Sequence, residues 1–70
     1  MKQNLRELRT LKGLTQADLA TQLGVSRQAV IALETDKHSP SLDLAYKISS
    51  VFDLPVEAVF ENPYRPSQGD

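Results

Sequence analysis

The stretch from residue 16 to residue 35, QADLATQLGVSRQAVIALET, constrains the fold more than any other part of the chain. It contains two short amphipathic segments joined by Leu23-Gly24-Val25-Ser26. Two helices with so short a connection approach closely, so a small side chain is needed at Ala20, and Gly24 lets the backbone turn without a Cβ clash. The apolar side chains expected to close their shared core are Leu19, Leu23, Val25, Val30 and Leu33. Together, these residues predict two helices joined by a tight turn.

Polar residues at the expected helix ends support this interpretation. Thr15 is expected to cap the first helix of the pair, with Asp18 in its first turn, where the helix dipole favours an anion. The glycine of the turn is expected to end that helix with a positive φ. Ser26 is expected to cap the second helix, which runs to about Glu34 and is followed by a polar loop over residues 35–40.

A leucine repeat predicts a further helix over residues 4–12. The leucines recur there at three-residue spacing, as Leu5, Leu8 and Leu11. Asn4 is expected to cap this helix, and Glu7 to complete a capping box with it. Gly13 supplies a C-terminal stop.

The second half of the chain predicts two more helices. Ser41 is expected to cap a helix whose inward stripe has the i, i+1, i+4, i+7, i+8 spacing that is typical of a helix. This stripe consists of Leu44, Ala45, Ile48, Val51 and Phe52. Pro55 suits the start of a short fifth helix. The sequence therefore predicts an all-α fold, a compact bundle of five helices.

The length of the chain, 70 residues, fits one domain. We expect this domain to span residues 1–61 and a C-terminal tail to span residues 62–70, which hold two prolines, a glycine and little to bury.

Because the chain has no cysteine, disulfides and thiolate metal sites are excluded. No apolar run approaches the roughly 18 residues of a membrane span, and the N-terminus lacks a signal-peptide core, so we expect a cytoplasmic protein.

The helix that follows Ser26 has a face that its own core does not use. Arg27 and Gln28 begin this face, and Ile31 and Ala32 continue it, when the helix is turned by about 100° per residue. This is the layout of a helix-turn-helix, which can place its second helix in the DNA major groove. There Gln28 can pair with adenine, Arg27 can pair with guanine or a phosphate, and the apolar side chains can contact thymine methyl groups. The alternative is a set of solvated side chains, but an exposed Ile31 needs a partner, either DNA or protein.

The chain resembles the DNA-binding module of the Cro and phage-repressor type, the XRE family of bacterial regulators. The matching segments are LRELRTLKGLTQADLA, LGVSRQAVIALE and SPSLDLAYKISSVFDLPVEAVF, which cover roughly residues 3 to 60. The resemblance implies a repressor-like five-helix bundle in which helices two and three form the helix-turn-helix and helix three is the recognition helix. The DNA-facing positions that it implies are Gln16, Ser26, Arg27, Gln28, Ile31, Ala32, Lys37 and His38.

The resemblance also implies particular roles for some of these residues. Gln16, the first residue of helix two, would touch a phosphate and brace Gln28. Lys37 and His38 would lie in a loop that runs along the DNA backbone. This loop departs from the family pattern, because Thr35-Asp36 replaces the usual Asn-Gly. The change removes the residue best suited to positive φ and brings an anion near the expected path of the phosphates.

An internal ion pair between Arg9 and Glu34 is a further implication of the resemblance. The alternative is two separately solvated charges.

Two other departures from the pattern leave the fold intact. Asp53 replaces the usual glycine after helix four, and Asp tolerates the left-handed region better than most residues. Pro55 stands where a Ser or Thr cap is common.

Two classes of function fit these observations. The leading hypothesis is a sequence-specific DNA-binding transcriptional regulator, a repressor, that acts as a homodimer on a near-palindromic operator with its recognition helices about 34 Å apart. The alternative is a protein-interaction module such as an antitoxin or anti-activator, favoured by the net charge of −1 and the apolar Ile31–Ala32 face. His38 is the only histidine and no nucleophile accompanies a base, so we expect no enzyme activity, metal or cofactor. No small-molecule ligand is evident.

Dimerisation is expected to use the C-terminal third of the chain, where apolar residues exceed what one small bundle can cover. The candidates are Leu54, Val56, Val59 and Phe60, with Tyr64 at the edge of the patch. For Phe60, closing the core of a single subunit is the favoured alternative. For Leu54 and Val56, beside the Pro55 turn, burial inside one subunit is harder to arrange. Two linked half-sites would multiply the affinity for DNA through effective concentration.

Overall fold

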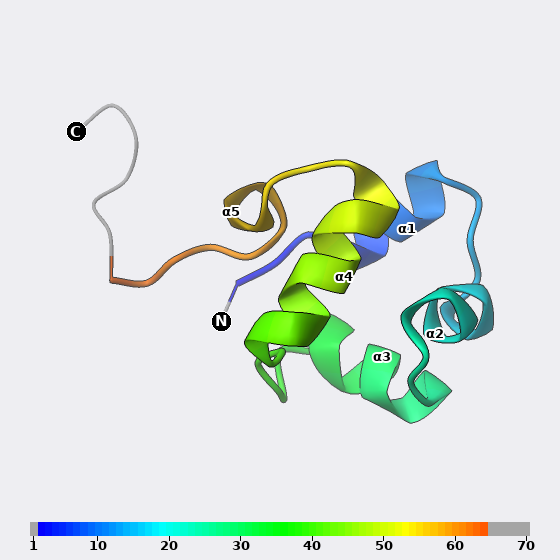
Figure 1. Ribbon diagram of the computed structural model, residues 1–70. Helices are drawn as coiled ribbons and strands as arrows, with labels where there is room; N and C mark the ends of the chain where they lie inside the picture. The colour runs from blue at the N-terminus through cyan, green and yellow to red at the C-terminus, as the bar shows by residue number, and fades with distance from the viewer. Residues whose placement is uncertain (1, 65–70) are drawn as a thin grey trace.

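The computed structural model describes residues 2–64, and within them the chain folds into five α-helices (Figure 1). They are α1 (Leu5–Leu11), α2 (Gln16–Leu23), α3 (Arg27–Glu34), α4 (Leu42–Phe52) and α5 (Val56–Val59). The predicted all-α fold is confirmed, and each helix lies where its sequence pattern placed it. The tail expected over residues 62–70 lies mostly outside the described residues.

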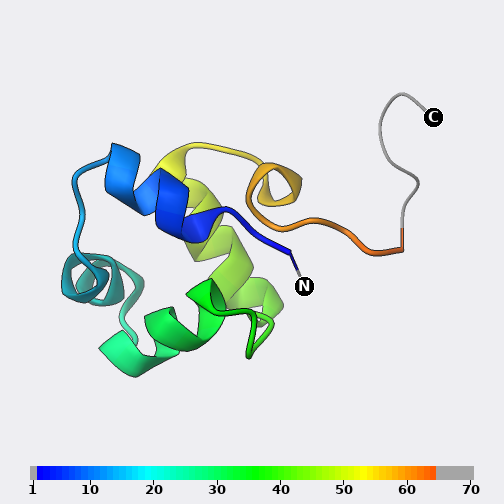
Figure 2. The same ribbon diagram turned by 180° about the vertical axis from the view of Figure 1, so that it is seen from behind.

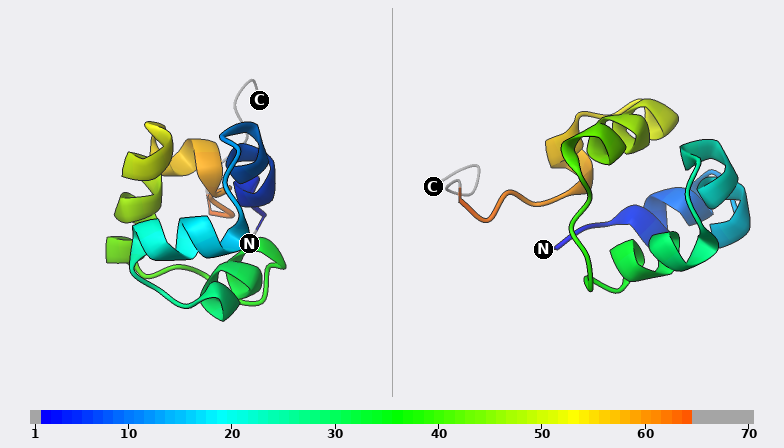
Figure 3. Two further views of the ribbon diagram at one scale, coloured as in Figure 1. Left: turned by 90° about the vertical axis from the view of Figure 1, so that its right-hand side faces the viewer. Right: turned by 60° about the horizontal axis from the view of Figure 1, so that its bottom comes forward.

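The helices are arranged so that α3 lies at one edge of the bundle. In Figure 1, α4 lies in front of α1, with α2 to the right, α3 below and α5 at the upper left. The view from behind shows α1 crossing α4 (Figure 2). α2 packs against both α3 and α4, α1 against α3, and α5 against α4. α3 is therefore supported on one side by α1 and α2 (Figure 3).

Side chains from all five helices share one hydrophobic core. The largest fully buried side chains are Leu5, Leu19, Leu23, Val30 and Ile48. Burying a side chain of this size contributes about 1.5–3 kcal/mol. Helices this short are marginal in isolation, so this shared core supplies most of their stability.

Two residues expected at a dimer interface belong to this core instead. Val59 and Phe60 are only 2% and 5% exposed within one subunit. The interface prediction is wrong for Val59, and for Phe60 the favoured alternative, closure of the core of a single subunit, is confirmed, because α5 folds back against α4 and the chain's N-terminal segment. Leu54 and Val56 are half-buried against the core, whereas Tyr64 is 93% exposed.

The helix ends follow local sequence signals. The hydroxyl oxygens of Thr15, Ser26 and Ser41 each accept a hydrogen bond from the backbone N–H three residues later, as predicted. Gly24 ends α2 with φ +72°, a left-handed conformation that costs glycine little. Asp53 ends α4 with φ +53°, so it fills the conformational role that the family usually gives to glycine.

The capping box expected at Asn4 is absent. Asn4 occupies the N-cap position of α1, but its side chain makes no cap hydrogen bond there and donates instead to Ala58 O at 3.2 Å. Its backbone, with φ −120° and ψ 29°, lies outside the extended region that capping residues usually adopt. Gln3 replaces it, since its Oε1 accepts a hydrogen bond from Leu5 N at 2.7 Å.

The N-terminal segment is paired with the segment that follows α5. Asn4 N donates to Val59 O at 3.1 Å, and Glu61 N donates to Lys2 O at 2.8 Å. Between these bonds, Gln3 and Phe60 form an antiparallel bridge. This pairing fixes α5 and the start of α1 to each other.

Candidate nucleic-acid interface

The outer face of α3 presents the two polar residues that the sequence analysis assigned to base recognition. Val30 and Leu33 are buried on the inner face, at 0% and 3% exposure. Arg27 and Gln28 are exposed in the first helical turn, directly after the Ser26 cap. Because Ser26 uses its hydroxyl to hold Ala29 N, at 3.1 Å, its side chain fixes where the helix begins. The start of α3 is thus a capped helix end that carries two long, exposed polar side chains.

The apolar part of this face is less accessible than the sequence analysis expected. Ile31 and Ala32 are half-buried, so the prediction of an exposed Ile31 is wrong. The loop after α3 turns back over its C-terminal end, where Lys37 N and His38 N both donate to Ala32 O at 2.9 and 3.3 Å. The half-buried apolar pair therefore does not by itself demand a protein partner.

Gln16 connects the start of α2 to both ends of α3. Its Nε2 donates to Glu34 Oε1 at 3.3 Å, and its Oε1 accepts from Arg27 Nη2 at 3.3 Å. The brace implied by the family resemblance therefore reaches Arg27 rather than Gln28. Since both ends of the amide are engaged, Gln16 limits the directions available to the Arg27 guanidinium.

The ion pair implied by the resemblance lies beneath this brace. Arg9 Nε lies 2.7 Å from Glu34 Oε2, and the two side chains are only 12% and 3% exposed. Arg9 Nη2 also donates to Glu34 Oε1 at 3.3 Å, and Arg9 Nη1 donates to Leu14 O at 2.8 Å. A pair this buried is stable only when its hydrogen bonds are satisfied, as they are here. The pair joins α1 to the end of α3, and it holds in place the Glu34 Oε1 atom that accepts the hydrogen bond from Gln16.

A shallow groove opens beside this network, between α1, the start of α2 and both ends of α3. Among the side chains that line it are Arg6, Thr10, Thr15, Gln16 and Arg27. Three arginines border the groove against the single carboxylate of Glu34, which is already paired with Arg9. A concave surface with this excess of positive charge suits an anion such as a DNA phosphate.

The amino end of α2, beside this groove, carries its own anion. The Asp18 carboxylate accepts a hydrogen bond from Thr15 N at 2.9 Å, while Asp18 N donates to the Thr15 hydroxyl at 3.0 Å. These bonds to the Thr15 backbone and side chain lower the pKa of Asp18 below its ordinary value of 3.8. Asp18 therefore stays ionised at neutral pH and caps the helix.

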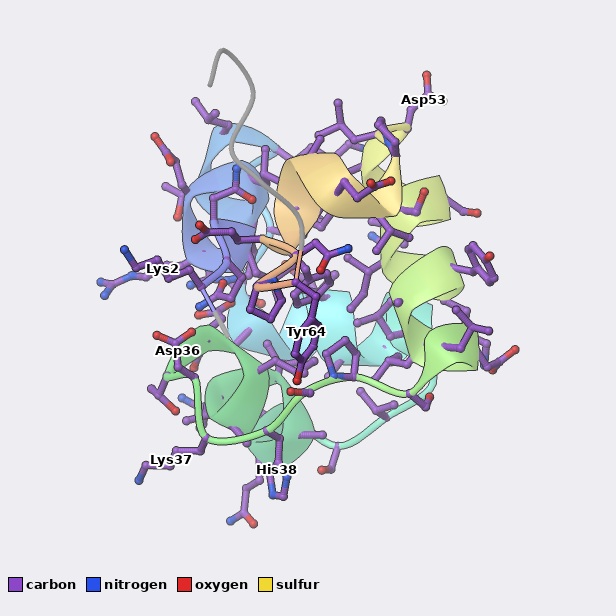
Figure 4. All side chains as sticks on the ribbon, turned by 90° about the vertical axis from the view of Figure 1, so that its left-hand side faces the viewer. Lys2, Asp36, Lys37, His38, Asp53 and Tyr64 are labelled. Atoms are coloured by element: carbon purple, nitrogen blue, oxygen red, sulfur yellow. The ribbon has the colours of Figure 1, made fainter. Side chains whose placement is uncertain are left out.

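The loop between α3 and α4 carries the remaining residues of the expected interface. Figure 4 shows Lys37 and His38 side by side on this loop, pointing away from the helices, with Asp36 nearer the N-terminal segment. Asp36 adopts φ +61°, so the chain makes the left-handed turn without the usual glycine. The Asp36 carboxylate accepts a hydrogen bond from Gln3 Nε2 at 3.0 Å. The anion that departs from the family pattern is thus tied to the protein itself.

The sequence profile described as helix-turn-helix matches residues 5–59, which span all five helices. The chain belongs to the helix-turn-helix family. Its α2 and α3 are the two helices of the motif, and Gly24 lies in the connection between them.

Several relatives share most of the length of this helix-turn-helix protein. An uncharacterized HTH-type transcriptional regulator of Methanocaldococcus jannaschii is 52% identical over 60 residues, covering 86% of this chain and 91% of the relative. Another from Archaeoglobus fulgidus is 45% identical and covers 86% of each chain. The uncharacterized HTH-type transcriptional regulator YgzD of Bacillus subtilis is 43% identical and covers 86% of this chain and 91% of YgzD. The relatives are therefore archaeal as well as bacterial, a wider range than the bacterial family named from the resemblance.

Three residues in or beside the candidate interface were not predicted from the sequence. Arg6 and Thr10 line the groove, and their i, i+4 spacing on the first helix was the signal that could have shown a shared face. Gln3 contacts Glu34 and Asp36, which lie 31 and 33 positions further along the sequence. No periodic pattern reports contacts at that separation.

The described residues offer little to other kinds of site. Over residues 2–64, no three His, Cys, Asp or Glu side chains gather closely enough to hold a metal ion. In the same range, no helix has the length and apolar character of a membrane span.

Proposed function

We propose that this helix-turn-helix protein is a sequence-specific DNA-binding transcriptional regulator. The observation that carries the proposal is the start of α3, where Arg27 and Gln28 are exposed and Arg27 is braced by Gln16. A recognition helix reads bases through its N-terminal residues, and long polar side chains held in place lose less conformational entropy on binding. We further propose that the protein acts as a repressor, in the cytoplasm, and that residues 1–61 form the DNA-binding domain.

Each polar residue of the interface has a distinct role in this proposal. Gln28 pairs with the edge of an adenine, and Arg27 pairs with a guanine or a phosphate. Lys37 and His38 contact the DNA backbone from the α3–α4 loop. Gln16 contacts a phosphate through the Nε2 N–H that it does not donate to Glu34, and its Oε1 braces Arg27.

The proposal includes a homodimer on a near-palindromic operator. Among the five interface candidates, Leu54, Val56 and Tyr64 keep exposed surface, since Leu54 and Val56 are half-buried and Tyr64 is 93% exposed. A two-fold dimer would present its two recognition helices about 34 Å apart, one turn of the duplex. Joining two half-sites compensates for the small number of phosphate contacts that one subunit with a net charge of −1 can make.

The alternative, a protein-interaction module such as an antitoxin or anti-activator, loses part of its support. It rested on the Ile31–Ala32 face and on the net charge of −1. Both side chains of that face are half-buried, so only the charge argument stands.

Selection of bound duplexes from a random-sequence pool tests the proposal. We expect a near-palindromic consensus, and an affinity for it that falls steeply with added salt because phosphate contacts release counterions. Recovery of no consensus, together with salt-independent binding to a protein partner, would favour the interaction module.

A further inference from the structure

Gln3 joins three separate parts of the chain through one side-chain amide. Its Oε1 accepts a hydrogen bond from Leu5 N at 2.7 Å, at the start of α1. Its Nε2 donates to Glu34 O, in the last turn of α3, and to Asp36 Oδ1, in the loop that follows, both at 3.0 Å. The Oε1 atom thus binds the start of α1, and the Nε2 group binds the end of α3 and the start of the loop that follows it.

The backbone of Gln3 is itself held firmly. It pairs with Phe60 in the antiparallel bridge, and the flanking bonds are Glu61 N to Lys2 O at 2.8 Å and Asn4 N to Val59 O at 3.1 Å. Phe60 is only 5% exposed, so the strand opposite Gln3 is anchored in the core. The amide therefore reaches the loop from a fixed base.

Asp36 is a position where such support matters. At φ +61°, Asp36 adopts a left-handed conformation that Asp tolerates better than most residues but less readily than glycine, so contacts that hold it favour the turn. The two bonds from Gln3 Nε2 hold both the carboxylate of this residue and the carbonyl two residues earlier. Lys37 and His38 follow immediately, and their backbone N–H groups return to Ala32 O. The donor end of one amide thus adds the side-chain contacts from the N-terminal segment to the backbone bonds that hold the loop where it leaves α3.

We propose that Gln3 is a positioning residue for DNA binding, because its Nε2 fixes the α3–α4 loop in the geometry that brings Lys37 to the DNA backbone. This inference rests on the proposed DNA-binding function. The arrangement in Figure 4, with Asp36 facing the N-terminal segment and Lys37 and His38 pointing outward, is the one that the contact maintains.

The variant that isolates this role is Gln3→Glu. A carboxylate can still accept the hydrogen bond from Leu5 N and suits the amino end of α1. It cannot donate to Glu34 O, and it repels the Asp36 carboxylate. The matched control is Asn4→Asp, which adds the same charge at the next residue and breaks only the contact of that side chain with α5. Gln3→Ala, which lacks the added charge, serves as a second variant if Gln3→Glu fails to fold.

The measurement is the affinity for a duplex obtained from the random pool, with each protein folded at the assay temperature. Gln3→Glu is expected to bind roughly threefold to tenfold more weakly than Asn4→Asp. Lys37→Ala should weaken the wild type and Asn4→Asp equally, yet cost much less in the Gln3→Glu background, because the loop there is already displaced. A purely structural role for Gln3 would leave the Lys37→Ala effect unchanged, and that additive result would overturn the proposal.

Hydrogen exchange of the free protein separates failure of this inference from failure of the proposed function. Gln3→Glu is expected to raise the exchange rates of the Lys37 and His38 amides, whereas Asn4→Asp leaves them unchanged. If the wild type binds no duplex, the DNA-binding function is wrong, whatever the exchange shows. If the wild type binds DNA and the exchange at both amides is the same in all variants, the positioning role is wrong.

Discussion

Replacing Glu34 with glutamine should destabilise the protein severely. The Glu34 carboxylate is 3% exposed and accepts hydrogen bonds from Arg9 Nε, Arg9 Nη2 and Gln16 Nε2, at 2.7, 3.3 and 3.3 Å. Glutamine keeps the shape but turns an amide donor toward the guanidinium. The charge of Arg9, whose side chain is only 12% exposed, is then left without its counterion.

The size of the effect follows from this burial. Removing one partner of a buried ion pair costs about 3–5 kcal/mol, since the remaining charge stays desolvated. A domain of 70 residues has a total stability of about 4–10 kcal/mol. For a domain of this size each kcal/mol lowers the melting temperature by about 4–8 °C, so Glu34→Gln should melt at least about 12 °C below the wild type.

Thermal unfolding followed by circular dichroism measures this difference. The matched control is the double replacement of Arg9 by Met and Glu34 by Leu, which removes both charges and fills a similar volume. Replacing a whole buried pair with apolar residues is often neutral, so the control should recover the part of the loss that comes from the unpaired charge, although it also removes the hydrogen bonds to Leu14 O and from Gln16 Nε2. A melting temperature for Glu34→Gln within about 2 °C of the wild type would refute the reasoning.

Three further predictions concern the interface, the assembly and the response to acid. Lys37→Ala should weaken binding to all duplexes alike and flatten the dependence of log affinity on log salt by about one unit; an unchanged slope would remove Lys37 from the backbone contacts. Val56→Asp should give a folded monomer with much weaker operator binding, and sedimentation that shows a wild-type monomer already bound tightly to one half-site would contradict the dimer. The lowered pKa of Asp18 means that its stabilising effect is complete above the ordinary value of 3.8 and is lost as the pH falls through the lower, folded-state value. Wild type should therefore exceed Asp18→Asn in stability at neutral pH and approach it in acid, whereas a constant difference down to low pH would contradict this.

Local sequence signals were enough to predict the helices and most of their ends. The hydroxyl caps at Thr15, Ser26 and Ser41 act on N–H groups only three residues away, so the residue type and the start of the apolar pattern locate them. The left-handed ends at Gly24 and Asp53 also depend on a single residue's conformational preference.

Contacts between distant segments could not be predicted in the same way. Asn4 satisfied the local rule for a cap, but its side chain bonds to Ala58 because residues 2–4 are paired with residues 59–61. The same pairing buries Phe60, whereas the sequence left it divided between the core and an interface. Gln16 was expected to brace Gln28, but it is the neighbouring Arg27 that donates a hydrogen bond to Gln16. The order of residues along a helix face does not say which of two adjacent long side chains turns toward a neighbouring helix.

The central claim is that the start of α3 reads DNA bases. It is tested most directly by measuring the affinities of the wild type and Gln28→Ala for the selected operator and for every single-base variant of one half-site. The wild type should discriminate at several positions. Gln28→Ala should lose discrimination at one base pair per half-site, where each contact is worth about 1–3 kcal/mol, and keep it elsewhere. Identical profiles for the two proteins, or no discrimination by the wild type at any position, would contradict the claim.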